Sequence, residues 1–353
     1  MNIQMKLKHK IQLLLIFISA IIYLVAIGYI SIQARQNAYS DARKLVDSEV
    51  DRFASEIEGQ LNTNMTVSRT LAQGFSNYDY LPMDSWMDFV NRVYEDVFPE
   101  YEDFYNLWDS WELSVIDTSW NKPYGRIVNE HFRDQGMIRV NQSRNSLDGD
   151  NELYKKVKES NREMVLPLYF DMHAEGKSER KLMTSLLAPV RQENGDYAGA
   201  VGVDITMDRF QEILANVEIK GLEGSHAFLL SHQWNYAAHP DTSYLNEKIS
   251  KNPTANKSFN LYDKLSEGER FSIIHKEDEY NKEYVSYAPV RIGRTGTPWY
   301  LGIAVPVKSI MKEADRNFII SLIVGIIGLL ILSGVIYYIT QGITNRSEEH
   351  TSE

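Results

Sequence analysis

The sequence predicts an α+β protein: two related α+β units in tandem, preceded by a long N-terminal stalk helix and flanked by two transmembrane helices. Three observations support this fold class. Two apolar runs without a charged residue lie near the ends of the chain. Apolar residues recur every three or four positions after the first run, as in an amphipathic helix. A four-residue motif appears twice, about 100 residues apart, each time at the end of a strand-like segment.

Two segments are apolar enough to cross a bilayer, residues 11–32 and residues 318–340. Each has about the 20 residues that a spanning helix needs. The alternative for the first segment is a cleaved signal peptide, but the apolar core of such a signal is usually only about 7–15 residues long. We therefore expect two membrane helices, with the lipid bilayer as a partner.

Basic residues set the expected orientation of these helices. Three lysines shortly precede the first segment, which places residues 1–10 in the cytoplasm by the positive-inside tendency. Residues 33–317 are then extracytoplasmic, and the second helix returns the chain to the cytoplasm. The sequence thus predicts a two-pass membrane protein with a large outside segment.

The cytoplasmic tail, residues 341–353, has an unusual end. Residues 346–353 read Arg-Ser-Glu-Glu-His-Thr-Ser-Glu and resemble the translation of a sequencing-library adapter. On this interpretation the tail is truncated near Asn345, and a cytoplasmic output domain would lie beyond it. The alternative is a genuine short polar tail.

Residues 39–75 are predicted to form the stalk helix, because apolar residues recur at helical spacing and no proline interrupts them. This stripe either packs on the domain that follows or forms a homodimer seam, and the two interpretations are compatible. We expect a homodimer through the stalk and membrane helices. The stripe consists of Val46, Val50, Phe53, Ile57, Leu61 and Met65.

Strand-like runs separated by turn signals divide the rest of the outside segment into a membrane-distal unit, residues 76–217, and a membrane-proximal unit, residues 218–310. In the distal unit, residues 105–108 and 111–116 are predicted as two separate strands. Each unit also contains Ala-Pro-Val-Arg at the end of a strand candidate, followed by a glycine-containing turn and an apolar strand. These matched surroundings favour an internal duplication.

Composition and motifs exclude several classes of function. A formal net charge of -11 argues against general nucleic-acid binding, and the absence of cysteine excludes disulfides and thiolate sites. No phosphate-binding loop, His-Glu-x-x-His or nucleophile elbow occurs. The spacing of His226, His232 and His239 is a weak metal signal. We expect no catalytic residue, no cofactor and no metal.

The order of these elements resembles the double Cache sensor domains of bacterial receptors. The resemblance covers about residues 33–317 and implies two PAS-like units, ligand binding in the distal unit, and signalling across the bacterial cytoplasmic (inner) membrane. The output implied is a chemoreceptor, histidine kinase, cyclase or phosphatase domain. The motifs that carry the resemblance are Gly-Ala-Val-Gly-Val-Asp-Ile at 199–205, Ala-Ala-His-Pro-Asp at 237–241, Tyr-Ala-Pro-Val at 287–290 and Trp-Tyr-Leu-Gly-Ile-Ala-Val-Pro at 299–306.

The same resemblance implies ligand-binding residues. In family members that bind amino acids, an Arg-x-Trp-Tyr run, a Tyr-x-Asp and the aspartate of the Gly-Val-Asp strand contact the ligand. Asn151 and Leu153 stand at the arginine and tryptophan positions here. The matching residues of this chain are Tyr154, Tyr169, Asp171 and Asp204.

The chemistry of these residues favours a cationic ligand. Buried carboxylates attract an ammonium, and tyrosine faces add cation–π attraction, whereas a bidentate carboxylate clamp needs an arginine. Because side chains alternate along a strand, Asp204 shares a face with Gly202 and Ala200, whose small size leaves room for a ligand. The alternative is that the tyrosines are core aromatics and Asp171 caps a turn. Further pocket candidates are Trp108, Trp111 and Trp120.

We therefore expect a non-enzymatic extracytoplasmic sensor of a small molecule, such as an amine or another amino-group-bearing metabolite, that signals across the membrane. Two other classes of protein stay open at this point: a membrane-tethered extracytoplasmic enzyme and a structural assembly protein.

Overall fold

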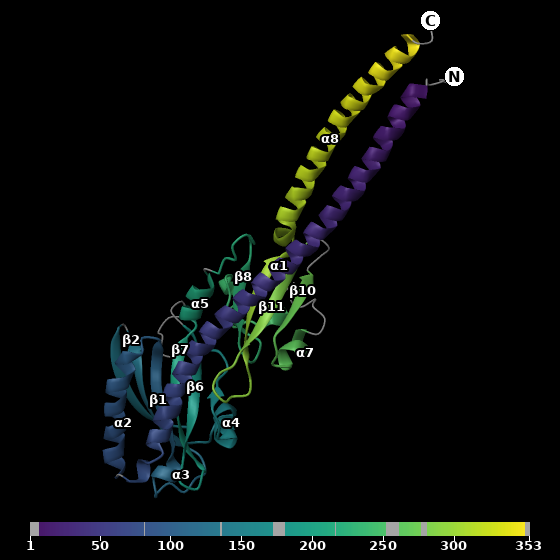
Figure 1. Ribbon diagram of the computed structural model, residues 1–353. Coiled ribbons are helices and arrows are strands. Elements are labelled where there is room, and N and C mark those ends of the chain that lie inside the picture. Colours follow the sequence, from purple (N-terminus) through teal and green to yellow (C-terminus); the bar gives the residue numbers. More distant parts are fainter. Residues whose placement is uncertain are drawn as a thin grey trace. The chain divides into compact units, whose positions relative to one another are not determined.

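The computed structural model describes residues 7–80, 82–134, 136–171, 181–215, 217–251, 261–276 and 281–349 (Figure 1). The chain divides into two compact parts. The first, called the helical part below, combines Met1–Leu45 with Pro306–Glu353, and the second, called the sheet part, is Val46–Val305.

The helical part contains the portion of α1 (Leu7–Phe75) before Val46 and most of α8 (Val307–Glu349). Both helices are long and apolar enough to cross a membrane. They approach closely at Gly325, where an added Cβ would lie 2.7 Å from Ile27 Cδ1. Small residues allow such contacts between membrane helices. Helix α1 has no break, so the expected membrane helix and stalk helix are one continuous helix.

The distal sheet of the sheet part has seven strands in the order β3-β2-β1-β7-β6-β4, with β5 also paired to β6. All of these pairings are antiparallel. The strands are β1 (Phe104–Glu112), β2 (Arg126–Asp134), β3 (Met137–Asn145), β4 (Met164–Val165), β5 (Tyr169–Phe170), β6 (Leu182–Arg191) and β7 (Tyr197–Thr206). The α-helices of this unit are α2 (Met83–Val97), α3 (Leu113–Ile116), α4 (Glu152–Ser160) and α5 (Asp208–Ala215), with 3-10 turns η1 (Tyr78–Tyr80) and η2 (Phe98–Glu100).

Strand β1 shows how the sequence separates the two faces of this sheet. Side chains alternate between the faces of a strand. Leu107 and Trp111 are fully buried toward α2, where the Trp111 ring lies 4.4 Å from the Trp86 ring. Asn106 and Trp108 point to the opposite face, which carries α4 and the cavity described below.

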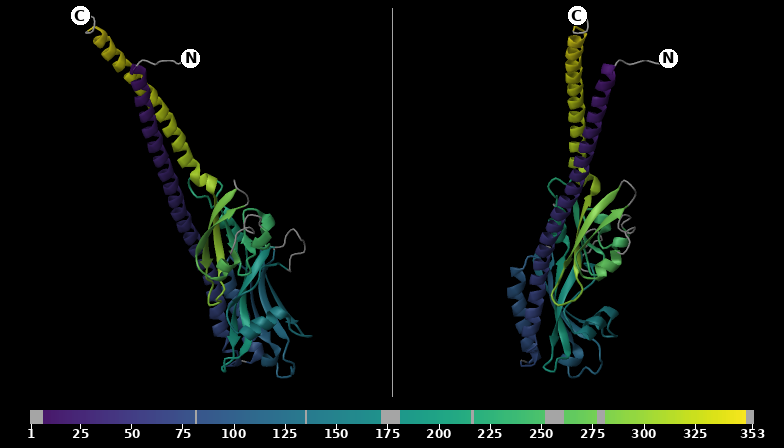
Figure 2. Two further views of the ribbon diagram at one scale, coloured as in Figure 1. Left: turned by 90° about the vertical axis from the view of Figure 1, so that its right-hand side faces the viewer. Right: turned by 45° about the vertical axis from the view of Figure 1, so that its right-hand side comes forward.

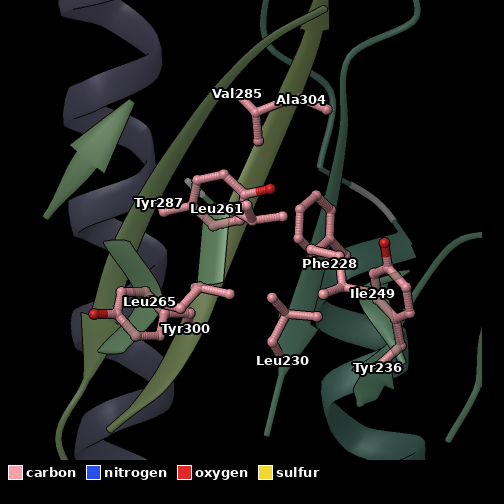
Figure 3. Packing of buried hydrophobic residues seen from close by; sticks show 10 residues of the cluster. All are labelled: Phe228, Leu230, Tyr236, Ile249, Leu261, Leu265, Val285, Tyr287, Tyr300 and Ala304. Carbon is pink, nitrogen blue, oxygen red and sulfur yellow. The ribbon is translucent and has the colours of Figure 1, made fainter. Parts of the chain in front are cut away.

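The proximal sheet has five strands in the order β10-β11-β12-β8-β9. One face is covered by an apolar and aromatic core that includes Phe228 and Tyr287, whose ring centroids are 5.8 Å apart (Figure 3). The elements are β8 (His226–Leu230), β9 (Tyr236–Ala238), η3 (Thr242–Tyr244), η4 (Ile249–Lys251), α7 (Leu261–Ser266), β10 (Phe271–Lys276), β11 (Lys282–Val290) and β12 (Trp299–Pro306).

The remainder of α1, from Val46 to Phe75, runs alongside both sheets (Figure 2). Asp47 accepts a hydrogen bond from Tyr284 of β11 at 2.9 Å, and Ser68 Oγ donates one to the Leu186 carbonyl of β6 at 2.9 Å. Five of the six residues in the predicted apolar stripe are fully buried within this protomer; the exception is half-buried Phe53. A dimer contact would therefore use another face of this helix.

The duplicated motif ends β6 in the distal sheet and β11 in the proximal sheet, and the next strand, β7 or β12, lies beside it. Each of these next strands has a glycine beneath an aromatic ring of its neighbour. A Cβ on Gly202 would lie 2.2 Å from Trp108 of β1, and a Cβ on Gly302 would lie 2.2 Å from Phe228 of β8. The two sheets thus repeat one packing arrangement.

One predicted strand is wrong. Residues 105–108 and 111–112 belong to the same strand, β1, and residues 113–116 form the helical turn α3 instead of a strand. The two residues between the predicted strands, Asp109 and Ser110, are polar, yet both are buried within the continuous β1 ladder.

Candidate ligand-binding site

A cavity of about 590 Å³ lies on the α4 face of the distal sheet, a size typical of small-molecule sites. Strands β1, β2, β6 and β7 form its floor, and α4 and the segment before β5 form its walls. Four aromatic side chains line it: Tyr105, Trp108, Tyr154 and Tyr169.

Asp204 of β7 is a buried acid that lines this cavity. Trp108 Nε1 donates to its Oδ1 at 2.8 Å, and Asn106 Nδ2 donates to its Oδ2 at 3.1 Å. Burial raises the pKa of the Asp204 carboxyl to about 6, and hydrogen bonds from Ser185, Trp108, Tyr169 and Asn106 oppose this rise. At neutral pH most molecules therefore carry a poorly solvated negative charge here.

Asp171 and two tyrosines lie at the same end of the cavity. Tyr105 Oη donates to Asp171 Oδ2 at 2.5 Å, and the Tyr169 hydroxyl lies 3.0 Å from Ser185 Oγ. Burial is the main cause of the raised pKa of both tyrosine hydroxyls. The negative charge of Asp171 raises the pKa of Tyr105 further, and the negative charge of Asp204 raises the pKa of Tyr169 further. Both tyrosines stay neutral and can donate hydrogen bonds at physiological pH.

Tyr154 of α4 stands at the other end of the cavity. Asn151 caps this helix, since its Oδ1 accepts from the Tyr154 amide at 2.8 Å. Tyr154 Oη then donates to Glu112 Oε1 at 2.7 Å, and Glu112 also pairs with Lys158. The residue that aligns with the family's arginine is thus a helix cap.

Arg126 of β2 supplies a guanidinium that was not among the site residues predicted from the sequence. Its guanidinium carbon lies 3.9 Å from the centre of the Tyr154 ring. Its Nε is buried and has no hydrogen-bond partner among the described residues. No sequence motif marks this arginine; it reaches the cavity because β2 pairs with β1 so that Arg126 lies opposite Glu112.

The structure brings five of the seven predicted site residues together: Trp108, Tyr154, Tyr169, Asp171 and Asp204. Trp111 does not line the cavity, because it lies on the α2 face of β1. Trp120 lies in the segment before β2, where its Nε1 donates to the Tyr124 carbonyl at 2.6 Å, and it does not line the cavity either. The space expected above Gly202 is occupied by the indole of Trp108.

The charges around the cavity are unequal. Among the described residues, three carboxylates line it, Glu130, Asp171 and Asp204, against the guanidinium of Arg126. Glu130 accepts from Asn141 Nδ2 at 2.6 Å, so it is held in place from β3. The electrostatic field of this arrangement attracts a cationic group to the Asp204 end, and Arg126 attracts an anionic group to the Tyr154 end.

Solved structures of known proteins share this fold. The periplasmic sensory domain of the Campylobacter jejuni chemoreceptor Tlp1 aligns with a TM-score of 0.62 and 13% identity over 78% of this chain and 98% of that chain. The ligand-binding domain of the Pseudomonas fluorescens chemoreceptor CtaA, in complex with L-isoleucine, aligns with a TM-score of 0.52 and 14% identity over 79% of this chain and 98% of that chain.

Sequence comparison gives a curated relative and a family. The methyl-accepting chemotaxis protein McpA of Pseudomonas putida is 26% identical over 161 residues, which are 42% of this chain and 23% of that protein. The chain therefore matches less than a quarter of the length of that relative. The family model described as Cache domain matches residues 31–314. Since this match covers most of the chain, the protein belongs to the Cache domain family.

Proposed function

We propose that this protein is an extracytoplasmic sensor that binds a small amino-group-bearing molecule in the distal cavity and signals its presence across the membrane. The observation that carries the proposal is the buried carboxylate of Asp204 at the acidic end of the cavity. An isolated buried charge is costly, and a ligand ammonium offsets that cost by pairing with it. The faces of Trp108 and Tyr169 add cation–π attraction at this end.

Arg126 extends this proposal to the other end of the ligand. In the register, Asp204 lies opposite Asn106 and Arg126 lies opposite Glu112. Asn106 and Glu112 are about six residues apart along β1, which corresponds to roughly 20 Å between their backbone positions. Long side chains cross only part of this span. We propose that a ligand with an amino group and an acidic group several bonds apart fits best, with Arg126 binding the acidic end.

The relatives support a ligand that carries an amino group. The CtaA domain was solved with an amino acid, L-isoleucine, and both CtaA and Tlp1 are chemoreceptors. For this chain we propose a non-catalytic sensor domain in a bacterial cytoplasmic membrane. The remaining elements of the proposal are two membrane passes, homodimer formation through the α1 and α8 helices, and a cytoplasmic output such as a chemotaxis or kinase domain.

A ligand series tests this function on residues 33–317 made without the membrane helices. We expect amines and amino acids with separated charges to raise the melting temperature, and carboxylates of matched length to have little effect. Ligand at about 100 times Kd stabilises by roughly 2.7 kcal/mol, a shift that is easily measured. Within the series, ω-amino acids of increasing length report the distance between the Asp204 and Arg126 subsites. Stabilisation by the carboxylates alone would show that the proposal is wrong.

A further inference from the structure

A second cavity, of about 340 Å³, lies in the sheet part where the distal sheet approaches the turn between β11 and β12. Four arginines line it together with one carboxylate, Glu163; the arginines are Arg69, Arg162, Arg191 and Arg294. They come from four segments: α1, the connection from α4 to β4, the end of β6, and the β11–β12 turn. We call this place the four-arginine cavity.

Glu163 neutralises part of this charge and holds the cavity together. Arg69 Nε donates to Glu163 Oε1 at 2.5 Å, and Arg69 Nη2 donates to Oε2 at 2.8 Å. The backbone amide of Arg294 also donates to Oε2, at 2.8 Å. Burial opposes the charged form of Glu163, but these hydrogen bonds and the charges of Arg69 and Arg294 lower its pKa below the usual value. Glu163 is therefore ionised and already accepts three hydrogen bonds.

The turn between β11 and β12 is shaped to reach this carboxylate. Gly293 adopts a positive φ of 51°, and a Cβ there would lie 2.5 Å from Glu163 Oε2. Its amide donates to Asn62 Oδ1 of α1 at 2.7 Å. The turn is thus fixed by α1 and by Glu163 together, and this brings Arg294 beside the distal sheet.

The other arginines retain unused donors. Arg191 uses Nε and Nη2 on the side-chain and backbone oxygens of Asn161, at 3.1 and 2.6 Å. Arg162 and Arg294 are exposed, and within the described residues their guanidinium groups make no hydrogen bond and no ion pair within 4 Å. Like charges gathered in this way repel one another, so the arrangement is strained electrostatically unless an anion joins it.

The overall charge makes this cluster unusual. The chain has a formal net charge of -11, whereas the four-arginine cavity has four cationic side chains and one acid. Guanidinium groups bind carboxylate and phosphate oxygens in a bidentate way. A compact anion with two or more charges would satisfy the free donors of several arginines at once.

We propose that the four-arginine cavity is a second binding site, separate from the distal ligand cavity, for a small multiply charged anion such as a polycarboxylate or phosphate. Arg162 and Arg191 bind it from the distal unit, and Arg294 binds it from the β11–β12 turn. The bound anion ties this turn to the distal unit.

Binding to the full chain in nonionic detergent micelles tests the proposal. Citrate and inorganic phosphate are the probes, titrated by calorimetry at constant ionic strength set with sodium chloride. We expect saturable binding of at least one probe, and at least tenfold weaker binding by the double variant R162Q/R294Q. The matched control R92Q/R209Q removes two exposed arginines elsewhere on the sheet part and should bind as the wild type does. The stronger probe identifies the anion class.

Two further measurements keep the result interpretable. Citrate or phosphate should slow hydrogen exchange at the Arg294 and Thr295 amides of the wild type. This measurement does not depend on whether a variant folds. The variant D204N should bind the anion as the wild type does. A loss of ligand binding in the distal cavity can then be distinguished from a loss of anion binding in the four-arginine cavity. No saturable binding by the wild type, or equal weakening in R92Q/R209Q, would overturn the proposal.

Discussion

At the residue scale, Asp204 is held by Trp108 and Asn106 with its carboxylate on the cavity. The substitution Asp204→Asn keeps the size of the side chain and removes its charge. We expect the affinity for an amino ligand to fall by about 30-fold, on the order of 2 kcal/mol, because the ammonium loses its buried partner. The ligand-free melting temperature should stay the same or rise, since a desolvated charge is gone.

Calorimetry and thermal melting on the same variant check this prediction. Asp208→Asn is the control, because Asp208 is exposed and pairs with Lys181 away from the distal cavity. A large loss of melting temperature with intact affinity would instead identify Asp204 as a structural residue.

Asp109, on the opposite face of β1, predicts a pH dependence of stability. It is fully buried, and Trp111 Nε1 and Asn129 Nδ2 donate to it at 2.6 and 3.3 Å. Burial raises the pKa of Asp109 from an ordinary 3.8 to about 7. The folded state therefore binds this proton more tightly than the unfolded state, and the resulting stabilisation is full below about pH 4 and is lost as the pH rises through about 7.

This group alone should make the wild type more stable at pH 6 than at pH 8, by on the order of 1 kcal/mol. Burial lowers the pKa of the histidines His131, His232 and His239, which has the opposite effect on stability. The measurement is therefore the difference in unfolding free energy between the wild type and Asp109→Asn at both pH values. A difference that does not change with pH would show that Asp109 is ionised throughout.

Residue-scale sequence reasoning located the acids of the cavity but not its arginine. Asp204 stands out because it interrupts an apolar strand, and Tyr154 and Asp171 belong to local motifs. Arg126 becomes visible only through the pairing of β2 with β1, and no local pattern encodes which strands pair. Trp111 was named as a pocket candidate beside Trp108, but the two residues lie on opposite faces of the continuous strand β1, and a residue's face depends on its parity in the strand.

At the element scale, the glycine of each apolar strand makes room for the aromatic ring beside it. Gly202→Ala places a Cβ 2.2 Å from the Trp108 indole, which must move away from Asp204. We expect a loss of about 1–3 kcal/mol of stability from overpacking and a weaker affinity for the amino ligand. Thermal melting and ligand titration measure the two effects.

The proximal strand offers a matched control. Gly302→Ala brings a Cβ equally close to Phe228, which belongs to the core of the proximal sheet. This variant should lose similar stability and retain the ligand affinity of its folded fraction. Equal loss of affinity in both variants would contradict a distal binding site.

Elements with strong apolar patterns were predicted well, and exposed ones were missed. Strands β6, β7, β11 and β12 contain the repeated Ala-Pro-Val-Arg motif or the apolar motifs noted in the sequence, and their buried apolar runs are bounded by turns. Strand β3 is an edge strand whose side chains are exposed or half-buried throughout, so its sequence carries no alternation to recognise. It pairs with β2 through the backbone ladder and through polar side chains such as Asn141, which donates to Glu130, and not through an apolar face.

At the scale of the whole molecule, the prediction concerns topology. Two helices can span a membrane, and three lysines precede the first. We expect reporter fusions to place residues before the first span and after the second in the cytoplasm, and a fusion within the β8–β9 region outside. An external N-terminus, or its removal from the mature protein, would show this topology to be wrong.

The repeated glycine–aromatic pair has a consequence for how such proteins diversify. In the proximal copy, Phe228 belongs to a buried hydrophobic core, whereas in the distal copy Trp108 lines a cavity. A duplicated module lets one copy retain a stable interior while the other accumulates changes. In evolutionary terms, the distal copy is free to acquire new chemical preferences, and laboratory libraries aimed at a new analyte should randomise that copy and leave its proximal twin untouched.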